Sequence, residues 1–560
     1  MQNCRLATVQ SGLFLRLIIV ACYFLNVLGV MLQVHELISA VRLAIYGRLP
    51  WLALCAICMF LPAGAKAVNS PRRPIDVLHY TLWLHPDIAT QTLAGEVEIR
   101  FRFLPGSGPV VFDLDTALRV ESVVLDGLVQ SRFVRQGALI ELDYALHVPA
   151  HTYARVRIKY RGKPRAARKP PWDGGLVWAQ TNTGKPWVGV ACQQDGASLW
   201  WPCKDDVADE PDSGATILCD APLGLTAVAN GRQTGPATLT ADGKGKTWRW
   251  DVTYPINPYC ITINIGPYSW QQAPLSGPAG PFEARVWLLK EDSTRGFDYL
   301  WPRIRQMMDG YQALFGAYPF TRDGYQLVQT PYWGMEHQSA VAYGNGFRPD
   351  GFGLDFILIH ETGHEWWGNR VSVADPADLW VHEAFCTYGE ALLCERLFGK
   401  AAMQQYLASQ RKRIENKSPL QGPRGVRYHG WQDADIYFRG AALLHTLRLL
   451  VGDSTKFMGA LQRVLARQAF VPTYTEDVVQ ILAQELGAGP AAFLQYALGL
   501  AHPPRLRYAA TKGGYKVWLE GYTGPPLPLT GLSVSGKAVV VKAKPALPPD
   551  WLIEVRQAGK

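Results

Sequence analysis

The sequence lacks the long basic stretches that proteins use to bind nucleic acids. Its formal net charge is +9 over 560 residues, and residues 1–67 contribute +4 of it through five basic side chains and one acidic one. The remaining +5 is spread over residues 68–560 without a dense stripe of Lys and Arg. The most basic segment, RGKPRAARKPP at 161–171, contains adjacent prolines and is typical of an exposed loop. We therefore expect no nucleic-acid partner.

Zinc-binding CxxC pairs, internal repeats and low-complexity tracts are also missing from residues 68–560. The cysteines of this part are Cys192, Cys203, Cys219, Cys260, Cys386 and Cys394, and their spacing matches no cysteine zinc site. Cys192 and Cys203 are close enough in sequence to form a disulfide in an exported protein, and small buried thiols are the other interpretation. Hydrophobic residues make up 48% and charged residues 18% of the chain. Together with the length, this composition predicts a multidomain globular protein with a sizeable core.

Two apolar stretches occupy residues 1–67. The first, GLFLRLIIVACYFLNVLGVML at 12–32, is long enough to span a bilayer. The second, LPWLALCAICMFLPAGAKA at 49–67, has a short apolar centre and ends in the small-x-small pattern of signal-peptide cleavage. We expect export with cleavage after Ala67, which would make the protein periplasmic or extracellular. The alternatives are a later translation start, such as Met31, and retention of the first stretch as a membrane anchor.

The period of the hydrophobic pattern changes twice along the rest of the chain. Segments such as EVEIRFRFL (96–104) and ARVRIKY (154–160) are apolar or alternating and are punctuated by Gly, Pro and Asp, which favours antiparallel strands. Helical periodicity follows in the segments 298–316, 355–369, 382–399 and 437–452. Alternation returns after about residue 505. We predict a multidomain α+β fold with a leader (1–67), a large N-terminal antiparallel β domain (68–290), an α/β domain (291–502) and a small C-terminal β domain (503–560).

The stretch LIHETGHEWWGNR at 358–370 contains two histidines four residues apart, His360 and His364. On a helix of 3.6 residues per turn they project from one face, where both imidazoles can bind one zinc ion. Glu361 lies beside them and can handle a water molecule. Apolar residues on both sides of the motif predict a buried helix, in which these ionisable groups need a partner such as a metal ion.

Glu383, in LWVHEAFCTYGE at 379–390, is the predicted third ligand. A carboxylate completes the open three-ligand site that is typical of catalytic zinc. Eighteen residues separate Glu383 from His364, and it lies near the start of a second amphipathic helix, so a helix–loop–helix hairpin could bring it to the first. This extended pattern is much rarer by chance than HExxH alone. We assign no metal role to the neighbouring His382 and Glu390.

With these residues in place, the chain resembles the gluzincin metallo-aminopeptidases, the family of aminopeptidase N and the leukotriene-epoxide hydrolase. WGMEHQSAVAYGN (333–345) is similar to the Gly-x-Met-Glu-Asn strand of the family, and YFRGA (437–441) is similar to the segment that bears its catalytic tyrosine. GNRVSVADPADLWVHEAF (368–385) resembles the link between the zinc helix and the third ligand. CQQDGASLWWPCKDD (192–206) resembles the N-terminal-domain loop whose glutamine reaches the active site. The likeness is that of a short bacterial-like member and implies a thermolysin-like catalytic domain.

The resemblance implies catalytic roles for the matching residues. It makes His360, His364 and Glu383 the ligands of one zinc ion per chain. It makes Glu361 the general base that deprotonates the attacking water, and Tyr437 the group that stabilises the oxyanion. These roles suit amide hydrolysis, which needs an activated water and a stabilised negative charge.

The resemblance also implies how a substrate is held. Glu336 would bind the free amine of a peptide by its charge, and Gln193 would contact the same N-terminal residue. The strand that contains Gly334 and Met335 would pair with the substrate backbone. The implied partners are therefore peptides with a free N-terminus.

The function implied is that of a zinc-dependent aminopeptidase, and alternatives stay open. A zinc endopeptidase shares the HExxH pattern with a distant glutamate, and a catalytically inactive relative could bind peptides only. Epoxide hydrolysis would need a lipid tunnel that the sequence does not show. The chain departs from the family motif at His337 and Gln338, and it ends about 60 residues after the last catalytic-domain helix, which predicts a more open cleft.

Overall fold

The computed structural model describes residues 75–559 apart from 107, 127–131, 143–148, 194–195 and 432. The predicted leader and its cleavage site lie outside the described residues, so export stays a prediction. Residues 69–560 belong to one compact unit. Within the described ranges, the helices are too short or too polar to cross a membrane.

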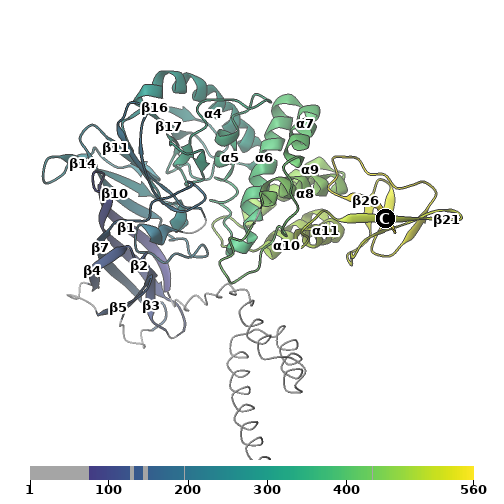
Figure 1. Ribbon diagram of the computed structural model, residues 1–560, viewed down its shortest axis with the longest axis horizontal. Coiled ribbons are helices and arrows are strands. Elements are labelled where there is room, and N and C mark those ends of the chain that lie inside the picture. The colour runs from purple at the N-terminus through teal and green to yellow at the C-terminus, as the bar shows by residue number, and fades with distance from the viewer. Residues whose placement is uncertain are drawn as a thin grey trace, which may run out of the picture. The chain divides into compact units, whose positions relative to one another are not determined.

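The N-terminal region is built from strands and short 3-10 turns (Figure 1). Its strands are β1 (Ile75–Asp87), β2 (Thr92–Phe103), β3 (Val110–Asp113), β4 (Leu118–Leu125), β5 (Phe133–Gln136), β6 (Leu139–Leu142), β7 (Tyr153–Gly162), β8 (Gly175–Gln180), β9 (Pro186–Ala191), β10 (Ala215–Pro222), β11 (Thr226–Ala229), β12 (Arg232–Gln233), β13 (Thr238–Leu239), β14 (Gly245–Val252) and β15 (Ile263–Gly266). The largest sheet has the order β12-β14-β10-β1-β2-β7-β4, with β13 beside β14. The two smaller sheets have the orders β11-β15-β9-β8 and β3-β6-β5.

Alternation along these strands explains the layered core. In β7, every second side chain is buried and those between are exposed, as the sequence ARVRIKY predicts. The buried side chains of the sheets form one apolar cluster that extends from Ile75 to Ala342. The predicted antiparallel β domain contains one parallel pair, formed by β1 and β10. A long crossover separates these two strands in sequence, as parallel pairing requires.

The central region combines a mixed sheet with helices (Figure 1). Its strands are β16 (Tyr268–Leu275), β17 (Phe282–Leu289), β18 (Tyr325–Gln329), β19 (Gly334–Met335) and β20 (Val341–Tyr343), in the order β16-β17-β18-β20-β19. Its helices are α4 (Ser293–Phe315), α5 (Phe356–Gly363), α6 (Trp380–Phe398), α7 (Lys400–Arg411), α8 (Asp435–Val451), α9 (Ser454–Arg467), α10 (Thr475–Leu486) and α11 (Ala488–Leu498). Helices α5 and α8 both pack against α6, and the side chains of α6 from Trp380 to Cys394 are buried. Helix α6 therefore lies at the centre of the region.

The C-terminal region is again made of strands. They are β21 (Arg505–Thr511), β22 (Gly514–Leu519), β23 (Leu527–Leu529), β24 (Leu532–Val534), β25 (Val539–Val541) and β26 (Glu554–Gln557). Their sheets have the orders β25-β22-β21-β26 and β23-β24. The buried side chains of this region belong to the same apolar cluster as those of the central helices. The boundaries of the predicted domains remain predictions.

Helix α5 is shorter than the predicted segment 355–369. It begins after Asp355, whose Oδ1 accepts a hydrogen bond from the backbone N–H of Leu358 at 3.2 Å. It ends at Gly363, because the backbone N–H groups of both Trp366 and Trp367 bond to the Gly363 carbonyl oxygen and tighten the chain into a turn. The pattern of apolar residues continued past this point and could not indicate the turn.

Candidate metal centre and active site

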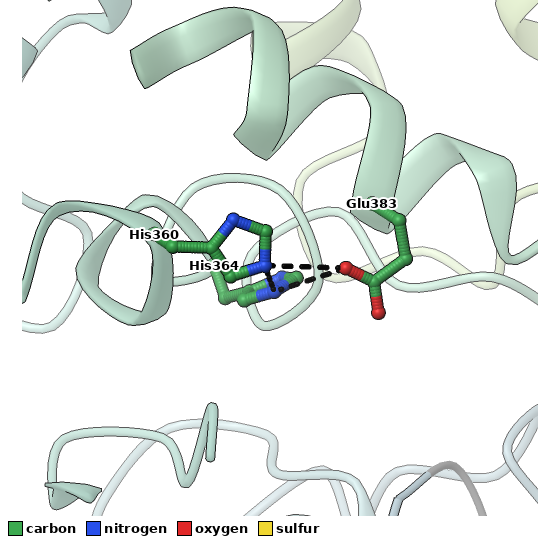
Figure 2. A group of neighbouring side chains, drawn as sticks. All are labelled: His360, His364 and Glu383. Carbon is green, nitrogen blue, oxygen red and sulfur yellow. Dashed lines mark hydrogen bonds and ion pairs between the residues drawn. The ribbon is translucent and has the colours of Figure 1, made fainter. Parts of the chain in front are cut away.

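Three ionisable side chains from α5 and α6 converge on one point, as Figure 2 shows. His360 lies in α5, His364 directly follows its last residue, and Glu383 lies in the first turn of α6. The Nε2 atoms of the two histidines are 3.3 Å apart. Glu383 Oε2 lies 3.4 Å from Nε2 of His360 and 3.5 Å from Nε2 of His364. The predicted ligands therefore present three atoms in a nearly equilateral triangle.

The size and chemistry of this triangle fit a zinc ion. Tetrahedral zinc with bonds of about 2.0–2.2 Å holds its ligand atoms about 3.3–3.6 Å apart, and two imidazoles with one carboxylate are a common donor set. Glu383 is fully buried, and within the described part of the chain its Oε2 atom accepts no hydrogen bond. A buried carboxylate oxygen without a donor is costly unless a cation binds it.

Hydrogen bonds behind each imidazole determine which nitrogen faces the centre. His364 Nδ1 lies 3.0 Å from the carbonyl oxygen of Trp367, and because a carbonyl oxygen only accepts, Nδ1 carries the hydrogen. His360 Nδ1 lies 2.6 Å from Oε1 of Glu390. The hydroxyl of Tyr406 donates to the other oxygen of Glu390 at 2.6 Å. Both histidines therefore keep the Nε2 lone pair for a metal ion.

The electrostatics of the cluster favour positive charge at its centre. Burial alone would lower the pKa of His360, but Glu383 and Glu390 raise it well above its ordinary value. Burial also opposes protonation of His364, whose pKa is raised by Cys386 and Glu383. Burial would raise the pKa of Glu383, yet the two imidazoles hold it well below its usual range. A divalent cation between these groups would satisfy the same negative charges.

We expect Glu390→Gln to weaken zinc binding about 10–100-fold, the usual effect of changing the outer partner of a ligating histidine. Tyr406 and Gln410 both donate to Oε2 of Glu390, so the carboxylate is held in place as the acceptor for His360. Glutamine preserves the shape but removes the charge that makes the imidazole a stronger ligand. Competition with a zinc chelator measures the change in Kd. The exposed control Glu291→Gln should bind as the wild type does, and an unchanged Kd in Glu390→Gln would contradict the role of Glu390.

Glu361 follows the first histidine and packs against strand β19. Burial raises the pKa of its carboxyl group to about 7, against the lowering effect of His360 and His364. A Cβ atom added to Gly334 would lie 2.5 Å from Oε1 of Glu361 and 2.7 Å from its Cγ. The Glu361 side chain therefore rests directly on the backbone of Gly334, where a larger residue has no room.

We expect Gly334→Ala to lower kcat about 100-fold, because displacing a catalytic group by about 1 Å has an effect of that size. Zinc affinity should stay the same, since the three atoms nearest to the added Cβ all belong to Glu361, which is not one of the predicted ligands. Gly459→Ala is a matched control, because a Cβ at Gly459 in α9 would meet nothing within 4 Å. Steady-state kinetics and zinc content test the pair, and a Gly334→Ala enzyme with wild-type kcat would show that Glu361 tolerates the displacement.

Strand β19 lies at the edge of the central sheet and leads into Glu336. Gly334–Met335 pairs with β20 on one side, and the described residues place no strand on its other side. Glu336 is 2% exposed, and Oε1 of its carboxylate accepts a hydrogen bond from the hydroxyl of Tyr259 at 3.2 Å. Glu336, Glu361 and His364 hold side-chain atoms within 4.8 Å of one another. A buried carboxylate, with its pKa raised by burial, thus adjoins the metal centre.

Tyr437 and Gln193 reach the metal centre from other parts of the chain. Tyr437, in the first turn of α8, has its ring centroid 5.8 Å from that of His360. Gln193 Nε2 lies 3.3 Å from the hydroxyl oxygen of Tyr437 and 3.3 Å from Oε1 of Glu383. Gln193, which was predicted to meet the substrate, therefore contacts two residues of the site itself.

A cavity of about 160 Å³ opens over these residues. Besides the predicted site residues, its lining consists of Pro171, Trp172, Trp333, Phe356, Ile357, Arg413, Ala434 and Phe438. Trp172 and Trp333 are 62% and 58% exposed, and their rings meet edge to face with centroids 6.4 Å apart. Sequence reasoning missed these residues, although Trp333 directly precedes Gly334. It also missed the contact of Glu390, which lies two helical turns after Glu383 in α6, with the ring of His360.

The two departures from the family motif do not alter the cavity. His337 and Gln338 are buried and are not among its lining residues. Gln338 Nε2 donates to the carbonyl oxygen of Pro255 at 2.9 Å. Burial lowers the pKa of His337 to about 3, so its ring is neutral. Both side chains therefore belong to the packing beneath the site.

With this geometry in view, comparisons with known proteins define the class. Residues 354–495 match the peptidase family M1 domain. Leukotriene A-4 hydrolase of Xenopus laevis is 22% identical over 440 residues, which cover 74% of this chain and 69% of that protein. Aminopeptidase B of Rattus norvegicus is 25% identical over 315 residues, which cover 53% of this chain and 45% of that protein. The chain thus spans less than half the length of this second relative.

Solved structures show the same fold. An M1 zinc metallopeptidase mutant from Deinococcus radiodurans, bound to a Tyr-Ser-Ala substrate, superposes with a TM-score of 0.65 at 23% identity. The superposition covers 77% of this chain and 95% of that structure. The chain therefore has the fold of this zinc metallopeptidase, and its buried cluster of His360, His364 and Glu383 fits a zinc ion. More particularly, the part of the chain that carries this cluster, residues 354–495, matches the peptidase family M1 domain.

Proposed function

We propose that this protein is an aminopeptidase that removes the N-terminal residue from peptides. The observation that carries the proposal is the buried carboxylate of Glu336, held beside Glu361 and His364 within 4.8 Å. Buried carboxylates are unfavourable without a positive partner. The α-ammonium group of a peptide supplies one, whereas an internal amide does not. Binding the amine there would place the first peptide bond over the metal centre.

The residues of this site divide the work of amide hydrolysis. His360, His364 and Glu383 would hold a zinc ion, which when bound would supply Lewis-acid chemistry to the scissile carbonyl and to water. Glu361 takes the proton of the attacking water at its carboxylate and delivers it to the leaving amine. Tyr437 donates its hydroxyl hydrogen to the developing oxyanion.

The edge strand orients the peptide for this reaction. On the side of β19 where the described strands leave it unpaired, backbone donors and acceptors can pair with an extended peptide as an added strand. Glu336 at the end of this strand then limits the register, because only a chain terminus can place an ammonium group there. The same strand with a different end residue would accept internal peptide segments, which is how an endopeptidase would differ.

One peptide in two forms, with a free amine and N-acetylated, tests the proposal. Mass spectrometry of the products, with and without a chelator, should show loss of the first residue from the free form only, and only without the chelator. Cleavage of both forms at internal bonds would instead make the enzyme an endopeptidase. Failure to cleave either form, at full zinc content, would count against peptide hydrolysis.

We expect Glu336→Gln to lower kcat/KM for the free peptide at least about 30-fold, since removing one partner of a buried charge pair costs about 2 kcal/mol or more. The preference for the free form over the acetylated form should shrink at the same time. The exposed control Glu291→Gln should keep both the rate and the preference. An undiminished preference in Glu336→Gln would show that another group binds the amine.

A further inference from the structure

The cavity over the metal centre is lined by one arginine side chain, that of Arg413. Its carboxylates are those of Glu336, Glu361 and Glu383, and apart from the histidines its cation is Arg413. Among the described residues, no carboxylate forms an ion pair with the Arg413 guanidinium, in contrast to Arg424, Arg439 and Arg448 nearby in the chain. The five N–H donors of Arg413 are therefore available to a ligand.

Arg413 is an exposed residue whose side chain contacts the ring of Phe438. Its Cζ atom lies over the ring of Phe438, 4.0 Å from the ring centroid, which is a cation–π contact. Its backbone N–H bonds to the carbonyl oxygen of Gln410 at 2.9 Å, one turn earlier. The paired N–H donors of a guanidinium match the two oxygens of a carboxylate.

The position of Arg413 lies within reach of a short peptide. The ring centroids of His360 and Tyr437 are 5.8 Å apart, and those of Tyr437 and Phe438 are 6.2 Å apart. Arg413 Cζ lies 4.0 Å from the ring centroid of Phe438. The guanidinium is therefore at most about 16 Å from the His360 ring, a span of about five extended residues. A peptide whose first residue is at the metal centre can bring a carboxylate to Arg413 within that length.

We propose that Arg413 binds a carboxylate of the substrate, so that peptides with a negative charge among about the first five residues are preferred. The proposal rests on the aminopeptidase function proposed above, because the free N-terminus sets the distance. The carboxylate has two possible sources, the C-terminus of a short peptide or the side chain of Asp or Glu in a longer one. Arg413 would then select substrates by charge.

Binding measurements in the Glu361→Gln background separate recognition from turnover. Calorimetry gives Kd for alanine-rich peptides from dipeptide to hexapeptide, each with a free C-terminal carboxylate or as the C-terminal amide. A second set consists of C-terminal amides that each contain one Asp, placed at a different position in each peptide. At one peptide length, or at one Asp position, we expect the peptide with the carboxylate to bind about tenfold more tightly than the same peptide without it. This is the size of effect expected for a charge-assisted hydrogen bond at a partly exposed site. The first set detects the C-terminal source and the second the side-chain source.

Variants of Arg413 identify the group responsible. Arg413→Gln should bring the ratio of the affinity for the charged peptide to that for its neutral counterpart close to one. Arg413→Lys should give a ratio between those of the wild type and Arg413→Gln, because a lysine keeps the charge but not the planar fork. The neighbouring exposed Lys412→Gln should retain the wild-type ratio. Added salt should reduce the ratio in the wild type more than in Arg413→Gln.

Two results would overturn the role of Arg413: a ratio near one at every length and Asp position in the wild type, or a ratio that survives Arg413→Gln. The N-acetylated forms of the same peptides distinguish this failure from failure of the proposed function. If they bind as tightly as the free forms, the amine is not recognised, whatever Arg413 does. If the acid preference then persists and depends on Arg413, the carboxylate site stands while the aminopeptidase proposal fails.

Discussion

Replacing Glu361 with glutamine is expected to lower kcat about 10³-fold, within the range that a general acid–base group contributes. Glutamine has nearly the same shape, so it can occupy the space against Gly334 but cannot take a proton from water. Burial raises the pKa of Glu361 to about 7, which suits a group that must both accept and release a proton near neutral pH. Zinc content and KM should change little, since Glu361 contributes no atom to the triangle formed by His360, His364 and Glu383.

The variant Glu383→Gln provides the contrast for this result. It should lose activity together with zinc, because Glu383 Oε2 lies within 3.5 Å of both imidazoles and has no other partner among the described residues. Zinc content by atomic absorption and single-turnover kinetics separate the two cases. A Glu361→Gln enzyme that keeps its zinc and retains a tenth or more of the wild-type kcat would mean that a different group moves the proton.

The metal cluster could be predicted because it depends on local geometry. His360 and His364 are four residues apart, so even a single helical turn places them on one face, whatever follows. Helix α5 does end at Gly363, earlier than predicted, yet this one turn is intact. The position of Glu383 needed one further assumption, a hairpin between two helices. The structure places all three side chains together, and the chemical role of each stays a prediction until it is tested.

The surroundings of the cluster could not be predicted because they depend on contacts between distant segments. Glu390 was assigned no role, since nothing in the sequence shows that a side chain two turns beyond Glu383 meets the ring of His360. Gln193 was predicted from a likeness, but its contacts with Glu383 and Tyr437 bridge about 190 and 244 residues of sequence. The parallel pairing of β1 with β10 has the same origin. Alternation of apolar residues predicts which side of a strand is buried, not which strand lies beside it.

Replacing Tyr437 with phenylalanine is expected to lower kcat about 100-fold with little change in KM, as loss of one oxyanion donor usually does. The Tyr437 ring stays in place through its contacts with His360 and Phe438, so only the hydroxyl is lost. Burial raises the pKa of this hydroxyl far above its usual value, so it remains protonated and able to donate throughout the neutral range. Gln193, which donates to the same oxygen, orients the hydroxyl hydrogen away from itself and toward the cavity.

The distinction between a donor and a packing residue lies in which kinetic constant changes. A residue that only shapes the cavity would raise KM, whereas a donor to the oxyanion acts in the transition state and lowers kcat. Tyr153→Phe serves as the control, because Tyr153 is 69% exposed on a strand of the N-terminal region. Gln193→Ala should give a smaller loss of kcat than Tyr437→Phe, since the hydroxyl remains but is no longer oriented. If Tyr437→Phe raises KM and leaves kcat unchanged, Tyr437 contributes to binding alone, and the oxyanion must be stabilised without it.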